Sequence, residues 1–262
     1  MKDLSQINPS IFRLTVPYKD IFTTVYVIQT EHGVLLFDAA SYDEDTPNYI
    51  LPMLAELGIA PQEVKYIFIS HNHTDHAGGL AGLLPHCPNA CIVSRSPALK
   101  EKYPQRQVLC PQAGHRLLEV LEVVPIPGHT QDCAALLDHR THTMITGDCL
   151  QLFGIFGSGN WCANITLPAE HLQAIETLRH MDNVEEILTA HDYHPYGYHY
   201  VGKKAISDAL DACVAPLDMV RELILTHPEW DDEQVREQFN APGTLPKLGV
   251  RMVTALRQML NA

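Results

Sequence analysis

The sequence predicts an α/β protein with a helical C-terminal part, and three observations support this prediction. Apolar runs rich in β-branched residues alternate, over residues 11–192, with segments whose apolar residues follow helical spacing. From about Tyr200 only helical patterns follow. The 262 residues are enough to bury a large core. We therefore expect a main domain of layered strands and helices over residues 1–200 and a helical C-terminal extension packed on it over residues 201–262.

The expected strands are short and bounded by turn-forming residues. They cover 11–16, 23–30, 32–40, 64–70, 90–94, 116–127, a hairpin at 134–148 and a last strand at 184–192. The expected helices carry end signals, such as Gly58 after the first and Pro97 in the first turn of the second. They cover 46–58, 96–103, 166–181, 203–224, 231–239 and 245–260.

Charge and cysteine content disfavour several kinds of partner and location. The 18 Lys and Arg against 31 Asp and Glu give a net charge of −13, whereas nucleic-acid binding draws on clustered cations. We therefore expect a small-molecule substrate and no nucleic-acid partner; self-association as a homo-oligomer stays open. The seven cysteines form no Cys-x-x-Cys pair, which favours a reducing compartment. The sequence shows no secretion signal and no apolar stretch of about 18 residues, so we expect a cytoplasmic protein without a membrane partner.

One short segment is unusually rich in metal-binding side chains. HNHTDH (71–76) directly follows the apolar run 64–70. Two histidines at positions i and i+2 leaving a strand point to the same side. Asp75 and His76 lie where the chain turns into AGG (77–79), so they can face a second point nearby. Imidazole nitrogen and carboxylate oxygen are ligands of zinc, and also of iron or manganese, so the segment predicts a metal site.

Further ligands are expected at the ends of other strands. His129 lies in the sharp turn PIPGHT, Asp148 follows the apolar run in MITGD, and His191 ends VEEILTAHD. Because strand ends at one edge of a sheet converge, these three side chains are candidates for the same site.

These segments together resemble a known family. HNHTDHAGG resembles the HxHxDH signature of the metallo-β-lactamase superfamily, and GHT, TGD and AHD follow in the order of its other ligand motifs. Asp38, in LLFDAA, matches an acidic residue that the family carries after an early strand. The resemblance spans roughly residues 11–200. It implies an αβ/βα sandwich, in which two mixed β-sheets pack face to face with helices on both outer faces.

The resemblance also implies a site for two divalent metal ions, zinc being expected first and iron or manganese second. One ion would be held by His71, His73 and His129, the other by Asp75, His76 and His191, with Asp148 bridging both. A bound metal lowers the pKa of water to about 7, which would supply a metal-bridging hydroxide to attack a carbonyl carbon. Asp75 would be the catalytic residue that orients this hydroxide and moves a proton. Asp38 would fix a ligand loop or a ligand imidazole.

Other segments are candidates for the pocket wall. The loop LFGIFGSGNWC (152–162) would line the metals or pack on the C-terminal helices, and VPYKDIF (16–22) is a second candidate rim. The remaining candidate side chains for the pocket are His194, His199, Tyr193, Tyr196 and Tyr198. We interpret three cysteines near the ligands as small buried residues rather than ligands, namely Cys133, Cys149 and Cys162.

The function expected first is metal-dependent hydrolysis of a small ester, thioester or lactone, because the resemblance points to the glyoxalase II and acyl-homoserine lactonase branches. A phosphodiesterase or nuclease could use the same metals, but the acidic charge disfavours it. A flavodiiron-type reductase typically has Glu at the position of His73. A β-lactamase would be expected to carry a secretion signal. A non-catalytic binding or signalling protein on this fold remains the alternative of a different class.

Overall fold

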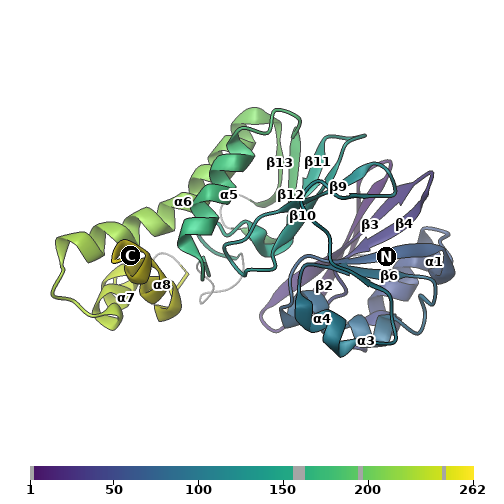
Figure 1. The fold of residues 1–262 in the computed structure, drawn as a ribbon, viewed down its shortest axis with the longest axis horizontal. Coiled ribbons are helices and arrows are strands. Elements are labelled where there is room, and N and C mark those ends of the chain that lie inside the picture. The colour runs from purple at the N-terminus through teal and green to yellow at the C-terminus, as the bar shows by residue number, and fades with distance from the viewer. Residues whose placement is uncertain (1–2, 156–162, 194–196, 244–245) are drawn as a thin grey trace. The chain divides into compact units, whose positions relative to one another are not determined.

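The computed structural model describes residues 3–155, 163–193, 197–243 and 246–262. The chain forms two compact units, residues 1–123 and 124–262, which are described separately (Figure 1). The first unit contains a seven-stranded sheet and the second contains most of a six-stranded sheet. Both sheets have parallel and antiparallel strands. In the described ranges no helix has the length and apolarity that crossing a bilayer requires.

The first unit contains a seven-stranded sheet whose strands lie in chain order. They are β1 (Leu4–Asn8), β2 (Ile11–Tyr18), β3 (Ile21–Thr30), β4 (Gly33–Phe37), β5 (Val64–Ile69), β6 (Cys91–Ser94) and β7 (Val108–Leu109). The pairs from β1 to β4 are antiparallel and those from β4 to β7 are parallel. The parallel strands therefore have their carboxyl ends at one edge, which is where ligands bind in such sheets.

Short helices connect the parallel strands of the first unit. They are a π-helical turn (Thr46–Ile50), α1 (Leu51–Glu56), a 3₁₀ turn (Pro61–Glu63), α2 (Thr74–Ala77), α3 (Leu80–Leu83) and α4 (Pro97–Lys102). Apolar residues of these helices and of the strands form one buried core, which includes Leu36, Met53, Ile67 and Leu83.

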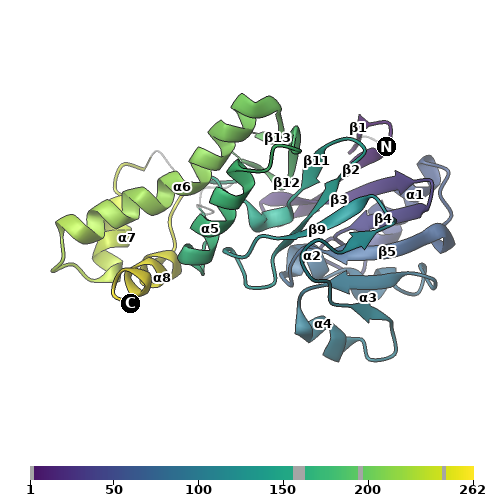
Figure 2. The same cartoon turned by 45° about the horizontal axis from the view of Figure 1, so that its top comes forward.

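The second sheet has six strands in the order β13-β12-β11-β10-β9-β8. They are β8 (Arg116–Leu117), β9 (Leu121–Pro125), β10 (Ala134–Asp138), β11 (Thr143–Ile145), β12 (Glu186–Tyr193) and β13 (Gly197–Val201). Its helices are a 3₁₀ turn (Gly147–Cys149), α5 (Pro168–Arg179), α6 (Gly202–Thr226), α7 (Asp232–Asn240) and α8 (Val250–Leu260). Helices α5 and α6 run side by side in both views (Figures 1 and 2).

The C-terminal helices have a core of their own within the second unit. Leu217 and Val220 of α6, Phe239 of α7 and Met252 of α8 are buried in it together with Ile165. Helix α6 continues through Pro216. The structure thus confirms an α/β fold of two mixed sheets with C-terminal helices.

Several expected elements differ from those observed. The strand expected at 32–40 ends at Phe37, because Asp38 and Ala40 have positive φ angles of 66° and 59°. The strand expected at 116–127 is a hairpin, since Leu118 and Glu119 also have positive φ and form its turn. The single helix expected at 46–58 begins with a π-helical turn, consistent with Pro52 lacking the N–H that a regular α-helix would use.

Three strands were absent from the sequence-based prediction. β1 pairs with β2 at one edge of the first sheet and β7 pairs with β6 at the other, while β13 follows β12, so the strand at 184–192 is not the last. All three are edge strands whose residues are mostly half-buried, so none has a strong apolar pattern.

Candidate metal centre

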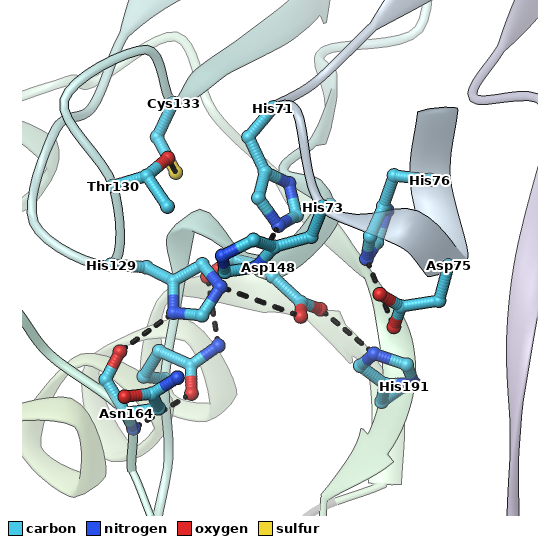
Figure 3. A network of polar contacts seen from close by, with 12 residues as sticks. His71, His73, Asp75, His76, His129, Thr130, Cys133, Asp148, Asn164 and His191 are labelled. Carbon is cyan, nitrogen blue, oxygen red and sulfur yellow. Dashed lines mark hydrogen bonds and ion pairs between the residues drawn. The ribbon is translucent and has the colours of Figure 1, made fainter. Parts of the chain in front are cut away.

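In the first unit, the histidine-rich segment lies at the carboxyl end of the parallel strand β5. His71 follows the strand closely and His73 is the N-cap of α2, so Asp75 and His76 fall in the first turn of that helix. The rings of His71 and His73 approach to 2.9 Å between Nε2 and Nδ1. Nε2 of His76 lies 3.5 Å from the Asp75 carboxylate. All four candidate ligands of this unit therefore lie within one tight turn (Figure 3).

Buried Asp38 lies beneath two of these imidazoles. Its carboxylate accepts hydrogen bonds from the Ser70 backbone N–H at 2.8 Å, from the Ser70 hydroxyl at 3.0 Å and from Nδ1 of His76 at 2.7 Å. Burial raises the pKa of the Asp38 carboxyl, and the donors on His76 and Ser70 act against this shift. The position expected to fix a ligand imidazole does contact one.

The same contacts determine which nitrogen of each ring carries the proton. The Ser70 hydroxyl donates to Asp38, so it accepts from Nδ1 of His71, 3.2 Å away. Nδ1 of His76 donates directly to Asp38. In both rings the proton is therefore on Nδ1, which leaves the Nε2 lone pair for a metal ion.

Close packing of backbone holds the turn after His76 against the loop after β4. A Cβ on Gly78 would overlap the carbonyl oxygens of Ser41 and Thr74, and one on Gly79 would overlap that of Ala39. The backbone N–H of Ala39 also donates to the carbonyl oxygen of His76 at 2.8 Å. The two glycines after the HxHxDH segment thus allow the approach that brings Asp38 to His76.

In the second unit, His129 lies in the turn after β9. Its Nδ1 donates to the carbonyl oxygen of Asn164 at 2.6 Å, which leaves Nε2 as the ligand atom. The Thr166 hydroxyl donates to the carbonyl oxygen of His129. Gly128 has a φ of 154°, and a Cβ there would lie 2.6 Å from that of His171, so the turn requires glycine. Burial lowers the pKa of His171 to about 4, and its Nε2–H donates to the Cys213 carbonyl, so we assign it a structural role.

Asp148 and His191 come from neighbouring parallel strands of the second sheet. Asp148 lies in the 3₁₀ turn after β11, and β11 pairs in parallel with β12, which carries His191. The Asp148 carboxylate is 3.1 Å from Nε2 of His191 and 3.9 Å from Nε2 of His129 (Figure 3). Unlike the expectation from sequence, His191 does not end its strand, since β12 runs on to Tyr193 past an irregularity in its pairing with β13.

The donor chemistry of both units fits divalent metal ions. The candidate donors are His71, His73, Asp75 and His76 in the first unit and His129, Asp148 and His191 in the second. Most of these residues are buried, and such imidazole and carboxylate donors suit zinc, iron and manganese alike. Each unit thus offers His and Asp donors that could hold a divalent metal ion.

Some of the other candidate residues lie in the described part of the chain and some lie outside it. Cys133 and Cys149 are buried thiols, as expected of small apolar residues. Tyr193 is buried in β12, and His199 of β13 lies 3.5 Å from Glu186. Several candidates lie outside the described residues, namely His194, Tyr196, Cys162 and positions 156–162 of the expected pocket wall, including Phe156 and Trp161.

The candidate rim at 16–22 lies in the hairpin of β2 and β3. The Thr23 hydroxyl, one residue beyond this segment, donates to the carbonyl oxygen of Asp75 at 2.7 Å. This bond ties the start of β3 to α2, so the rim segment belongs to the same part of the first unit as Asp75. Its role toward a substrate stays a prediction.

Four supporting residues were absent from the sequence-based prediction, namely Ser70, Gln151, Asn164 and Thr166. Ser70 could have been found, because it immediately precedes the HxHxDH segment. Asn164 acts through its backbone carbonyl, and Thr166 and Gln151 reach residues well separated from them in sequence. Only the fold brings these groups to the ligands.

We expect Asp38→Asn to weaken metal binding by about 10–100-fold, the range typical of residues that orient metal ligands. An amide nitrogen in place of Oδ2 would donate to Nδ1 of His76 and to the Ser70 hydroxyl, which moves the ring protons to Nε2 of His76 and His71 and blocks both ligand atoms. The backbone should tolerate the change, because Asn accepts the left-handed conformation at φ 66°. Competition with a chromophoric chelator would measure the affinity.

Asp45→Asn is the matched control for that variant. Asp45 is also buried, but its carboxylate accepts only backbone N–H groups, from Ser41 and Tyr42, among the contacts resolved for it. Unchanged affinity in Asp38→Asn, or an equal loss in both variants, would contradict a role for Asp38 in setting the tautomers.

Comparison with known proteins agrees with this fold and donor set. Residues 18–195 match the sequence profile of the metallo-beta-lactamase superfamily. The match covers more than half of the chain, and the protein belongs to this superfamily. The family resemblance expected from the motifs is therefore confirmed.

Among its relatives are hydrolases. A hydroxyacylglutathione hydrolase of Thermosynechococcus vestitus is 29% identical over 160 residues, which are 59% of this chain and 59% of that protein. The chain thus spans about three fifths of the length of that relative.

Solved structures support the fold. A metallo-beta-lactamase family protein of Thermus thermophilus has a TM-score of 0.69 at 19% identity, and the similarity covers 98% of this chain and 94% of that one. A flavo di-iron protein of Thermotoga maritima has a TM-score of 0.62 at 15% identity, covering 83% and 61% of the two chains. At these identities the likeness concerns the fold alone.

Proposed function

We propose that this protein is a binuclear metal-dependent hydrolase that cleaves a small-molecule ester, thioester or lactone. The observation that carries the proposal is the donor set. His71 and His76 of the first unit and His129 of the second have Nδ1 engaged in a hydrogen bond and Nε2 close to another candidate ligand of the same unit. A metal site needs histidines whose tautomer is fixed in this way, whereas an ordinary buried histidine has no such requirement.

Seven residues would hold the two ions, following the family pattern. One ion would be bound by His71, His73 and His129, the other by Asp75, His76 and His191, with Asp148 shared between them. The ligand groups described in each unit support this assignment. Zinc is our first choice of metal, and iron or manganese would suit the same nitrogen and oxygen donors.

When bound, such ions supply hydroxide at neutral pH and polarise a carbonyl oxygen. The chain's own contribution is to orient groups and to move a proton. The side chain of Asp75 is 14% exposed, more than that of its partner His76 or that of Asp38 on the other side of the same ring. Asp75 would therefore accept a proton from the attacking water and pass it to the leaving group, while the buried Asp38 would hold His76.

The relatives favour a thioester among the three substrate classes. The relative of Thermosynechococcus vestitus is a hydroxyacylglutathione hydrolase, and the name implies a thioester substrate. The net charge of −13 disfavours a nucleic-acid substrate. A di-iron redox role, like that of the flavo di-iron neighbour, is disfavoured because flavodiiron-type reductases typically have Glu at the position of His73.

A metal analysis combined with a substrate panel tests the proposal. We expect two divalent ions per chain and turnover of at least one thioester, ester or lactone that stops on chelation and returns when the metal is restored. A phosphodiester and a penicillin serve as comparison substrates. Turnover of the phosphodiester alone, or of no carbonyl substrate by protein that holds two ions, would refute the proposed reaction.

A further inference from the structure

Beneath the ligands of the second unit lies a buried glutamine that the proposed mechanism does not use. Gln151 is 4% exposed and follows Asp148 by three residues. Its amide nitrogen donates to the carbonyl oxygen of Asp148 at 3.0 Å and to the hydroxyl of Tyr193 at 3.3 Å. Its amide oxygen accepts the backbone N–H of Asn164 at 3.0 Å. One side chain thus contacts three separate segments.

The orientation of this amide is fixed by its partners. A backbone N–H can only donate and a carbonyl oxygen can only accept, so Oε1 must face Asn164 and Nε2 must face Asp148. If the amide were rotated, its NH₂ group would face the N–H of Asn164 and its oxygen would face the carbonyl oxygen of Asp148. These contacts therefore require both the oxygen and the nitrogen of an amide.

Each segment that Gln151 contacts carries or holds a ligand. Asp148 is a ligand itself, and the Asn164 carbonyl accepts the Nδ1 proton of His129. Tyr193 lies two residues after His191 in β12. The Gln151 amide thus connects three groups. They are the backbone of Asp148, the Asn164 carbonyl that fixes the tautomer of His129, and the strand β12 that carries His191.

We propose that Gln151 is a positioning residue that sets His129 and Asp148 relative to each other, and so tunes metal binding. This inference rests on the proposed metal site. The separation of the two ligands, 3.9 Å between Nε2 of His129 and the Asp148 carboxylate, is held through Asn164 on one side and the Asp148 backbone on the other. Loss of the amide would remove this link between Asn164 and the turn that carries Asp148.

Gln151→Met and Gln151→Asn test this role. Methionine keeps the length of the side chain and removes both hydrogen-bonding ends, whereas asparagine keeps the amide but is one methylene too short to span Asn164 and Asp148. We expect both variants to bind Zn²⁺ about tenfold more weakly or worse in competition with a chelator. We also expect an altered Co²⁺ absorption spectrum, because that spectrum reports the geometry of the ligands.

Thr143→Val is the matched control. Thr143 is equally buried in the second unit and bonds Thr141 and Glu186, neither of which is a ligand. It should lower thermal stability while leaving the Zn²⁺ affinity and the Co²⁺ spectrum unchanged. Equal spectral changes in Thr143→Val would show that Gln151 acts through general stability and would overturn the proposal.

The outcomes separate this inference from the proposed reaction. Both readouts need metal binding and no turnover, so protein that binds metal but cleaves no carbonyl substrate refutes the reaction and leaves this test valid. Wild-type affinity and spectrum in Gln151→Asn and Gln151→Met would overturn the role of Gln151 alone. If Gln151→Met does not fold, Gln151→Asn, which retains a buried amide, decides the result.

Discussion

Asp148→Ala is expected to reduce the bound metal from two ions per chain to one or none and to lower hydrolysis by on the order of 100-fold or more, since loss of a ligand should exceed the effect of losing a residue that orients one. The Asp148 carboxylate faces both His129 and His191, so a single truncation removes a donor from both proposed sites. Metal content after dialysis and initial rates on the best substrate would measure the effect.

Asp138→Ala provides the control for this experiment. Asp138 is as buried as Asp148 and lies in the same sheet, but its carboxylate pairs with Arg140 at the β10–β11 hairpin. We expect it to lose stability and to retain both ions. Two ions bound to Asp148→Ala would contradict the bridging assignment.

Asp75→Asn is expected to lower kcat by about 10²–10⁴-fold, the usual contribution of a positioned acid or base, with a smaller change in KM. The amide cannot accept a proton, although its oxygen remains available to a metal. Asp75→Ala should have at least as large an effect. Steady-state kinetics at saturating metal would separate loss of the proton carrier from loss of the ion.

The exposed Asp182 offers a comparison for the Asp75 variants. Its side chain is 98% exposed and lies 3.9 Å from Lys203, so Asp182→Asn should leave kcat unchanged. Wild-type kcat in Asp75→Asn with both metals bound would exclude Asp75 as the proton carrier. Unchanged biological activity of Asp75→Ala would favour a non-catalytic binding protein on this fold.

The sequence predicted the regular parts of the fold well. The runs at 64–70 and 134–148 became β5 and the β10–β11 hairpin because their apolar patterns are continuous and their ends carry turn residues. Helix α6 was expected at 203–224 and spans Gly202–Thr226. Long periodic segments are the ones that local pattern determines most strongly.

The elements that the sequence did not predict depend on unusual backbone angles or lie at the edge of a sheet. The turn at Leu118 and Glu119 uses positive φ without glycine, so no residue type announced it. β1, β7 and β13 are edge strands that pair on one side only, and their half-buried residues lack a clear alternation. Apolar alternation, the sequence signal that identifies a strand, is therefore weak in all three.

The candidate ligands could be named from the sequence because each is a His or Asp close to the end of an expected strand. Their supports were not, since Asn164 uses only its backbone and Gln151 depends on residues brought together by the fold. Asp38 is intermediate, because the family resemblance indicated its role and the structure gives its partners. Residue chemistry thus indicated the candidate ligands, and tertiary contacts showed which groups hold them.

The hydrogen bond between Asp38 and His76 has a consequence for the entropy of metal binding. The His76 ring is fully buried and already held at 2.7 Å by Asp38, so its rotamer freedom is lost when the protein folds. Immobilising a side chain at a binding site costs about 0.5–1.5 kcal/mol. That cost is therefore already met at His76 when a metal ion arrives. The protein is preorganised at this ligand by the carboxylate of Asp38.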